Sequence, residues 1–532
     1  MIATPANSKQ KYCIHIVLLA LVPLLFFGAA RNLDKSRGPL WLALNLDPSY
    51  PYLFSSLLIA NHYTPSLIGH PGTTTQILGA VILKAEHVFT GLSRTNVQVL
   101  TDPESTLSHI IVAITTATAF ALFVLPIAIW RRTQDISLAL LFQVTLLFFD
   151  QTYFNIVFFR PELCFPLLCL PLSYLLLSLN DDAGGALVAL AAGALAGACL
   201  MNKWTFCPFV ALGFIVIRSR KLQAAYFLGF ATALCILVLV IRTEVSRAVT
   251  FITNLLTHSG FYGEGPKELI DTATYYPGLL TLLHSDSTYI ILILTGLFLP
   301  ALSLLKLSLR DAIKHPTSRS LFGLGVLELL SFAVTAKYPT PHYLMPLVAL
   351  APLHVLLCAK LLYWHFFSFP GIASRGVIIG IVLVGLYHGY SRYSYYVADF
   401  RKAAAEQLNE YNALKLEKKK TGDMAVYYYR SSSPEYGLSF GNEAGSRYEF
   451  AQLLSTLYPN AWFFDISNVR FQSYGLNLSP EKFYTKHGRL LFLGSGYIEN
   501  TLPHGQKFPL PEGGKLTRLW SDPYGIIDEL TW

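Results

Sequence analysis

The stretch IHIVLLALVPLLFFGAA, residues 14–30, contains no Asp, Glu, Lys or Arg. A helix needs about 20 predominantly apolar residues to cross a hydrocarbon layer about 30 Å thick. Arg31 follows this stretch directly, without the small-residue motif of a signal-peptide cleavage site. The stretch therefore predicts a first membrane-spanning helix that stays in the mature protein.

Similar apolar runs recur through the first three quarters of the chain. They lie at 109–130, 136–149, 163–179, 184–200, 205–217, 223–241, 288–305, 320–336, 343–363 and 376–391. The chain is 53% hydrophobic and only 14% charged, whereas soluble domains carry about 25% charged residues. We therefore expect a mainly α-helical, polytopic transmembrane bundle of about eleven spans.

Basic residues gather in every second predicted loop, and Lys and Arg are enriched in cytoplasmic loops. They are Arg131 and Arg132, then Arg218, Arg220 and Lys221, then Lys306, Arg310, Lys314 and Arg319, and finally Arg375. Although Arg31, Lys35 and Arg37 after the first span oppose this orientation, the later loops decide it. An odd number of spans then predicts a cytoplasmic N-terminus and an exported C-terminus. The net charge of +8 reflects this anchoring, and no basic stripe interleaved with aromatic residues indicates a nucleic-acid partner.

The chain divides into two regions of different composition. Residues 1–392 hold the spans, with long outward loops at 31–108 and 242–287. Residues 393–532 are charged, rich in tyrosine and free of spans. Helices are expected at 397–420 and 446–458, and strands at 424–430, 461–466 and 489–496. The tail is therefore predicted to form a small extracytoplasmic α/β domain.

The first outward loop contains LNLDPSYPYL, residues 44–53, in which Asp47 lies among aromatic residues and prolines. A carboxylate in such surroundings at the membrane surface is expected to be partly desolvated, which raises its pKa and makes it a better base. Asp before proline is also a typical helix start, and the two interpretations are compatible. His70, in GHPG at the end of the same loop, fits an ordinary turn or a phosphate contact.

Further charged residues lie at the predicted outward ends of spans. They are Arg160 and Glu162 in FFRPEL, Lys203 in MNKWTF, and Lys337 and His342 in AKYPTPHYL. Charges at membrane edges cost free energy and usually serve a purpose, and cations stabilise a leaving phosphate. The structural alternative is an Arg160–Glu162 ion pair, with Lys203 and Lys337 extending to the membrane interface.

In this order, the motifs resemble the GT-C superfamily of membrane glycosyltransferases, which includes protein O-mannosyltransferases and the aminoarabinose transferase acting on lipid A. Asp47 and His70 match an aspartate and an H-P-x motif in the family's first outward loop. The resemblance implies that Asp47 is the catalytic base. It also implies a polyprenyl-phosphate sugar donor, a lipid, glycan or protein acceptor, and inversion at the anomeric carbon.

The resemblance covers about residues 1–392 and extends to the other outward charges. Arg160, Lys203, Lys337 and His342, together with His70, would bind the donor phosphate, with Glu162 in support. Two departures weaken the match, because His342 stands where arginine is common and Trp204 follows Lys203 where glycine is frequent.

Two supporting residues and one cofactor question stay open. Tyr50 lies close to Asp47 in the sequence, and Glu264 lies in a glycine-rich part of the loop 242–287 that suits a mobile flap or an ordinary turn. Asp47, Glu162 and the outward histidines offer ligands for a divalent metal. No spacing among them resembles a dedicated metal site.

Two other functions compete with the transferase. A transporter or flippase of lipid-linked sugars would favour paired charges near the bilayer midplane and corresponding halves, and the sequence indicates neither. A non-enzymatic membrane scaffold with an exported binding domain would need none of the outward charges.

Overall fold

The structure is a computed structural model that describes residues 5–69, 72–90, 96–366, 372–466, 468–485, 488–494, 508–523 and 525–532. It groups into two compact units, each built from separate stretches of the sequence. The helical unit consists of Met1–Arg31, Ile68–Thr75 and Val112–Tyr396. The mixed unit consists of Asn32–Leu67, Gln76–Ile111 and Val397–Trp532. The helices α1 (Pro5–Ser36), α3 (Thr73–Thr90), α5 (Pro103–Thr133) and α18 (Ile372–Thr421) contribute residues to both.

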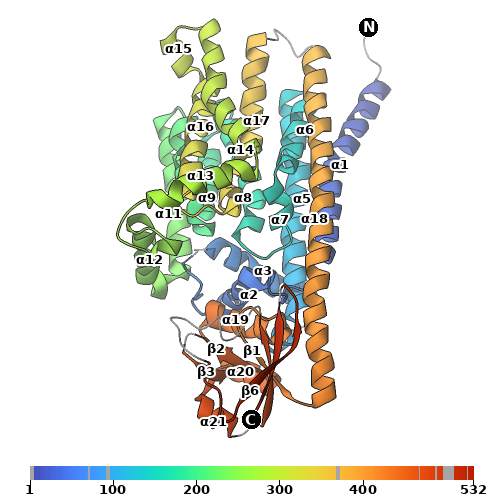
Figure 1. Cartoon of the computed structure of the whole chain (residues 1–532). Coiled ribbons are helices and arrows are strands. Elements are labelled where there is room, and N and C mark those ends of the chain that lie inside the picture. Colours follow the sequence, from blue (N-terminus) through green and yellow to red (C-terminus); the bar gives the residue numbers. More distant parts are fainter. Residues whose placement is uncertain are drawn as a thin grey trace. The chain divides into compact units, whose positions relative to one another are not determined.

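The helical unit is a bundle in which α9 (Ala186–Asn202) packs against both α8 (Pro161–Asn180) and α11 (Arg220–Val240) (Figure 1). The helix α17 (Met345–Phe366) packs against α8 and α16 (Pro316–Thr335). The other elements of this unit are α6 (Ile136–Val144), η1 (Thr145–Phe148), α7 (Asp150–Asn155), η2 (Trp204–Ala211), α10 (Leu212–Val216), η3 (Arg242–Glu244), α12 (Val245–Thr257), η4 (Phe261–Gly263), α13 (Thr272–Ser285), α14 (Thr288–Phe298), η5 (Leu299–Leu305), α15 (Leu309–Lys314) and η6 (Pro341–Leu344).

All eleven predicted spans lie on helices, but their number is not confirmed. Seven segments of the described chain are long and apolar enough to cross a membrane, and three more are apolar but shorter. The runs 205–217 and 288–305 each divide into an α-helix and a 3₁₀ segment. Prolines lie in both 3₁₀ segments, η2 and η5, and a proline cannot donate the backbone hydrogen bond of an α-helix.

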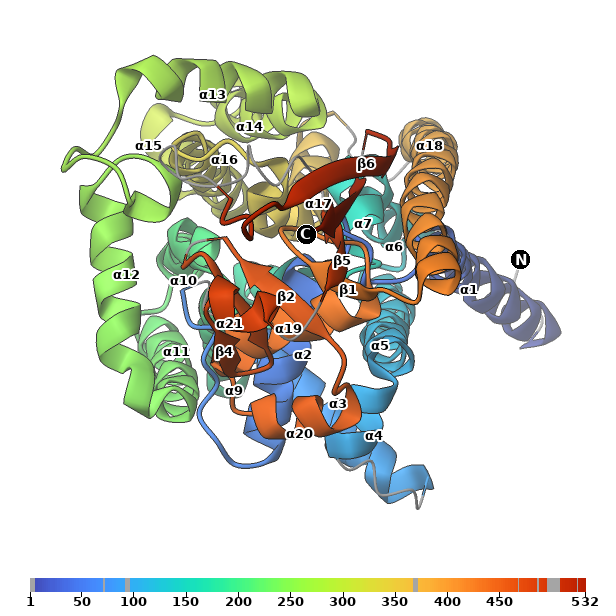
Figure 2. The ribbon, with the colours of Figure 1, turned by 60° about the horizontal axis from the view of Figure 1, so that its bottom comes forward.

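The mixed unit contains one seven-stranded sheet with the order β4-β3-β2-β1-β5-β7-β6. The strand β1 pairs in parallel with β2 and β5, and the remaining pairs are antiparallel (Figure 2). The other elements wholly within this unit are α2 (Leu46–Ala60), α4 (Asn96–Thr101), β1 (Met424–Tyr427), α19 (Pro434–Ser446), α20 (Ala451–Leu457), β2 (Trp462–Asp465), β3 (Arg470–Ser473), β4 (Leu476–Leu478), α21 (Pro480–Tyr484), β5 (Arg489–Gly494), β6 (Lys515–Ser521) and β7 (Ile526–Thr531).

The three predicted strands correspond to β1, β2 and β5, so the small C-terminal sheet is confirmed. The predicted helix 446–458 is shorter, because residues 447–450 form a turn before α20. The helix α19 was not predicted from the sequence. This helix packs closely against α2 through Gly437, Gly441 and Gly445, since a Cβ atom at Gly445 would lie 2.3 Å from the carbonyl oxygen of Pro51. The C-terminal stretch is thereby joined to α2, the element that contains Asp47.

Candidate functional site

Glu162 in the first turn of α8 and Lys203 at the end of α9 form a buried ion pair. Their side chains are 1% and 7% exposed. The attraction between two buried charges of opposite sign offsets part of the free-energy cost of removing both charges from water. The structural alternative paired Glu162 with Arg160 and extended Lys203 to the membrane interface. In the structure, Lys203 is instead buried and pairs with Glu162.

His342 and Tyr343 in η6 complete this group. The Nε2 atom of His342 lies 3.9 Å from Oε1 of Glu162, and the Lys203 ammonium lies 4.1 Å from the ring centroid of Tyr343. The hydroxyl of Tyr343 lies 3.1 Å from that of Tyr262 in η4. The loop 242–287 thus contributes Tyr262 to the group.

Arg160 immediately precedes α8 and is 7% exposed. Its guanidinium carbon lies 4.7 Å from the ring centroid of Phe154 and 4.6 Å from that of Phe158, which is a cation–π geometry. Helix N-termini favour anions, so the start of α8 combines a favourable dipole with this cation. The local arrangement is suited to holding a phosphate.

Lys337 and Glu264 do not join this group among the described residues. The ammonium of Lys337 donates a hydrogen bond of 2.5 Å to the carbonyl oxygen of Leu255 in α12, and partial burial lowers the pKa of Lys337. The side chain of Glu264 is exposed. Both positions therefore have less structural support than the other candidates.

His70 lies outside the described residues, but the segment after it is bound to Asn202. The amide of Gly72 donates to the carbonyl oxygen of Asn202 at 3.0 Å, and Thr75 Oγ1 donates to its Oδ1 at 2.6 Å. The Nδ2 atom of Asn202 donates to the carbonyl oxygen of Pro161 at 2.7 Å. Asn202 therefore ties this segment to the start of α8. The sequence did not predict this role of Asn202, because a neutral residue beside Lys203 gives no distinct signal.

Asp47 lies in the mixed unit and its side chain is exposed. The partial desolvation expected for this carboxylate at the membrane surface stays a prediction. The Asp47–Pro48 peptide bond is cis, both residues have non-helical backbone angles, and regular helix begins after them. Tyr50 is fully buried, and its hydroxyl donates to Oε1 of Glu104 at 2.9 Å. Burial, followed by the Glu104 charge, raises the pKa of Tyr50.

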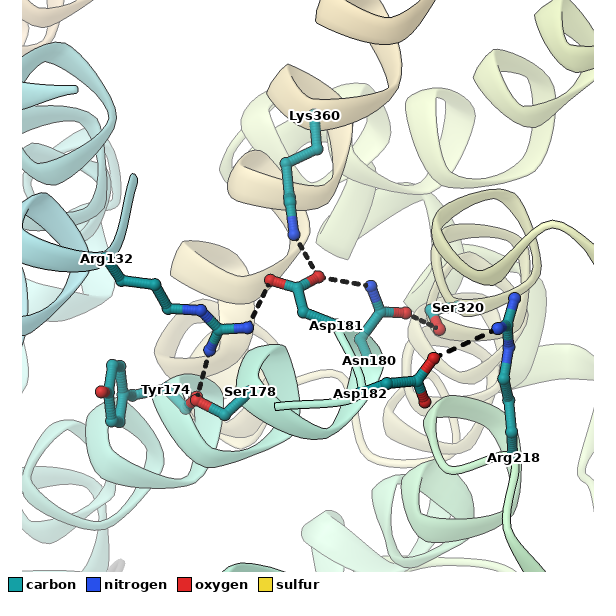
Figure 3. A network of polar contacts seen from close by, with 9 residues as sticks. All are labelled: Arg132, Tyr174, Ser178, Asn180, Asp181, Asp182, Arg218, Ser320 and Lys360. Atoms are coloured by element: carbon teal, nitrogen blue, oxygen red, sulfur yellow. Dashed lines mark hydrogen bonds and ion pairs between the residues drawn. The ribbon is translucent and has the colours of Figure 1, made fainter. Parts of the chain in front are cut away.

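A second polar network lies at the other end of α8 (Figure 3). Asp181 accepts from Arg132 at 2.8 Å and pairs with Lys360, while Asp182 pairs with Arg218 at 3.4 Å. Arg132 also donates to Ser178 at 2.8 Å. Because α8 has 20 residues, it is about 30 Å long, which matches the thickness of a bilayer core. The two polar groups therefore mark the two ends of one membrane-length helix.

Within the described spans, a histidine and a glutamate lie next to each other. Nδ1 of His354 in α17 lies 2.9 Å from Oε1 of Glu328 in α16, and both side chains are buried. Nε2 of His354 lies 3.0 Å from Oγ1 of Thr295 in α14. The sequence did not predict this pair, because the two residues are isolated in separate apolar runs.

No group of three or more His, Cys, Asp or Glu side chains that could hold a metal ion occurs in the described part of the chain. A divalent metal, left open by the sequence, thus has no ligand set of that kind there.

No family model and no curated protein sequence matches this chain. Among solved structures, the chain is similar to the crystal structure of ArnT from Cupriavidus metallidurans bound to undecaprenyl phosphate, with a TM-score of 0.51 and 12% sequence identity over 97% of both chains. The same protein in the apo state gives a TM-score of 0.48 and 11% identity over 98% of both chains. ArnT is a GT-C aminoarabinose transferase, and this likeness in fold agrees with the resemblance that the sequence motifs indicated for about residues 1–392.

Proposed function

We propose that this protein is a membrane glycosyltransferase that transfers a sugar from a polyprenyl-phosphate-linked donor to an acceptor on the non-cytoplasmic face. The observation that carries the proposal is the gathering of Arg160, Lys203 and His342 near Glu162 at the start of α8. It occurs in a chain whose fold resembles that of ArnT bound to undecaprenyl phosphate. Cationic side chains close to one another can bind the phosphate group of a lipid-linked sugar donor.

The proposed chemistry is a single displacement. Asp47 accepts the proton of the acceptor hydroxyl, whose oxygen attacks the anomeric carbon as the bond to the phosphate oxygen breaks. Inversion at the anomeric carbon follows from one in-line attack. Cationic side chains stabilise the negative charge that develops on the leaving phosphate, and Arg160, Lys203 and His342 are proposed for this role.

The charges at the two ends of α8 support the proposed orientation. Arg132, Arg218 and Lys360 lie in the network around Asp181 and Asp182, and basic residues are enriched on the cytoplasmic side. The Glu162 end then faces outward. In this orientation the N-terminus lies inside and the C-terminal stretch outside. The proposed location is a bacterial inner or plasma membrane.

The decisive test compares wild type with Asp47→Asn in proteoliposomes. Undecaprenyl-phosphate-linked monosaccharides serve as donors, envelope lipid extract as acceptor, and release of undecaprenyl phosphate as the readout. Removing a general base is expected to lower turnover about 10²- to 10⁴-fold. Asp271→Asn is the matched control, because Asp271 is half-buried and caps α13, a role asparagine fulfils equally well. Full turnover by Asp47→Asn would contradict the assignment of Asp47 as the general base.

Transport of a lipid-linked sugar is a second candidate, favoured by one observation. The Glu328–His354 pair lies within two candidate spans, where transporters place coupling residues. Movement of donor lipid across proteoliposomes without covalent transfer, lost in Glu328→Gln, would support that function.

A further inference from the structure

We propose that the C-terminal stretch of the chain positions the turn that carries Asp47, through Ser432 and Gln407 acting together with Glu104. The inference rests on the proposed function, in which Asp47 is the base. The turn comprises residues 37–47, between the end of α1 and the regular part of α2. All these residues belong to the mixed unit.

Glu104, at the start of α5, binds the chain on both sides of Asp47. Its Oε2 accepts from the amide of Leu40 at 2.7 Å, and its Oε1 accepts from the amide of Trp41 at 3.1 Å. The same Oε1 accepts from the hydroxyl of Tyr50 at 2.9 Å. One carboxylate thus fixes the approach to Asp47 and the helix that follows it.

Two side chains of the C-terminal stretch bind the middle of the turn. The amide of Ala43 donates to Oγ of Ser432 at 3.3 Å, and the amide of Leu44 donates to Oε1 of Gln407 at 3.0 Å. Ser432 lies in the loop between β1 and α19, Gln407 lies in α18, and both are buried. Four amides of the turn are therefore bound by side chains from three other parts of the chain.

The turn also closes on itself. Nδ2 of Asn45 donates to the carbonyl oxygens of Arg37 and Pro39 at 2.8 and 2.9 Å. A segment without regular secondary structure keeps one conformation only if its polar backbone groups have partners. Asp47 is the last residue of this turn, so a change in the backbone of the turn moves its carboxylate. Misplacement of a catalytic group by about 1 Å can cost about 10²-fold in rate.

The contacts can be tested directly by amide hydrogen exchange on the full-length protein. Ser432→Ala is expected to speed exchange at Ala43 by up to about tenfold, because one net hydrogen bond of about 1.4 kcal/mol corresponds to that factor. Ser431→Ala is the matched control. Ser431 is equally buried, but its hydroxyl accepts from the amide of Tyr428 and donates to the carbonyl oxygen of Leu493. Unchanged exchange at Ala43 in Ser432→Ala, or an equal increase in Ser431→Ala, would overturn the proposal.

Measurements of kcat and of the KM for the donor distinguish a positioning role of Ser432 and Glu104 from a role in donor binding. With a donor that wild type uses, Ser432→Ala and Glu104→Gln are expected to lower kcat at least about tenfold with an unchanged KM for the donor. Ser432→Thr keeps the hydroxyl and should restore kcat. A rise in KM alone, or no rescue by threonine, would contradict a positioning role. If Asp47→Asn keeps full turnover while Ser432→Ala still loosens the turn, the proposed function fails and the positioning contacts stand.

Discussion

The buried pair of Glu328 and His354 yields a prediction about stability. Glu328→Leu leaves His354 in an apolar interior with one charged partner fewer, and breaking such a pair costs about 3–5 kcal/mol. The double variant Glu328→Leu/His354→Leu should regain most of that loss. Thermal unfolding in detergent checks both, with sugar transfer measured on the folded fraction. Transfer that disappears in the folded double variant would show that the pair has a functional role.

The stability of the mixed unit is expected to depend on pH through the buried side chain of Glu410 in α18. Burial, and to a smaller extent the charge of Asp522, raises the pKa of Glu410 from 4.5 to about 8. The folded state therefore binds more protons than the unfolded state between these values, so stability falls as the pH rises through that window. Glu410→Gln should be less sensitive to pH when unfolding is followed at about pH 6 and about pH 9. Glu417→Gln on the same helix serves as the control, and an unchanged slope in Glu410→Gln would contradict the prediction.

Among single residues, the sequence singled out charged members of the group around Glu162 and none of its neutral members. Arg160, Glu162, Lys203 and His342 were singled out because charges at the ends of apolar runs are unusual, and the structure brings Glu162, Lys203 and His342 together. Asn202 and Tyr343 were missed because such residues are common near helix ends. Glu104 was missed because an acid in a first helical turn has an ordinary explanation in the helix dipole.

The packing of α9 against α11 depends on small residues. A Cβ atom at Gly193 would lie 1.8 Å from the carbonyl oxygen of Tyr226, and one at Gly229 would lie 2.0 Å from that of Leu190. Close approach of helices through small residues is typical of membrane proteins. Gly193→Ala should lower stability by about 1–3 kcal/mol, measured as thermal unfolding in detergent. Gly380→Ala in α18, where nothing lies within 4 Å, should be neutral or stabilising, and equal losses in both would refute this explanation.

Long elements were easier to predict than short ones. The span 376–391 and the helix 397–420 were expected as separate pieces, but they form one helix of 50 residues, α18, because no proline or glycine separates them. The strands β3 and β4 have only four and three residues. Their place is set by pairing with β2, which no local pattern reveals.

The orientation of the whole molecule can be measured with C-terminal fusions. If the Asp181 end of α8 is cytoplasmic, the chain after α18 is exported, so a fused alkaline phosphatase should be active and a fused green fluorescent protein dark. Replacing Arg132, Arg218 and Lys360 with glutamine should weaken this bias, because positive charge determines it. A bright fluorescent fusion to the unaltered chain would reverse the assignment of the two faces.

At the scale of the molecule, composition predicted the class of protein and the outward motifs predicted its fold. The boundary at 392/393 stays a prediction. The two compact units interleave their segments, since Asn32–Leu67 and Gln76–Ile111 cluster with Val397–Trp532. Contacts such as those between α2 and α19 join residues far apart in the sequence, and no pattern within either helix identifies its partner.

The bond between Ala43 and Ser432 joins positions 389 residues apart. During synthesis, residues 37–47 leave the ribosome long before the loop after β1 exists. Until that loop folds, the amides of Ala43 and Leu44 have no partners from it or from α18. Asp47 would then acquire its final direction only near the end of biogenesis, so a truncated or stalled chain should insert in the membrane without becoming an active enzyme.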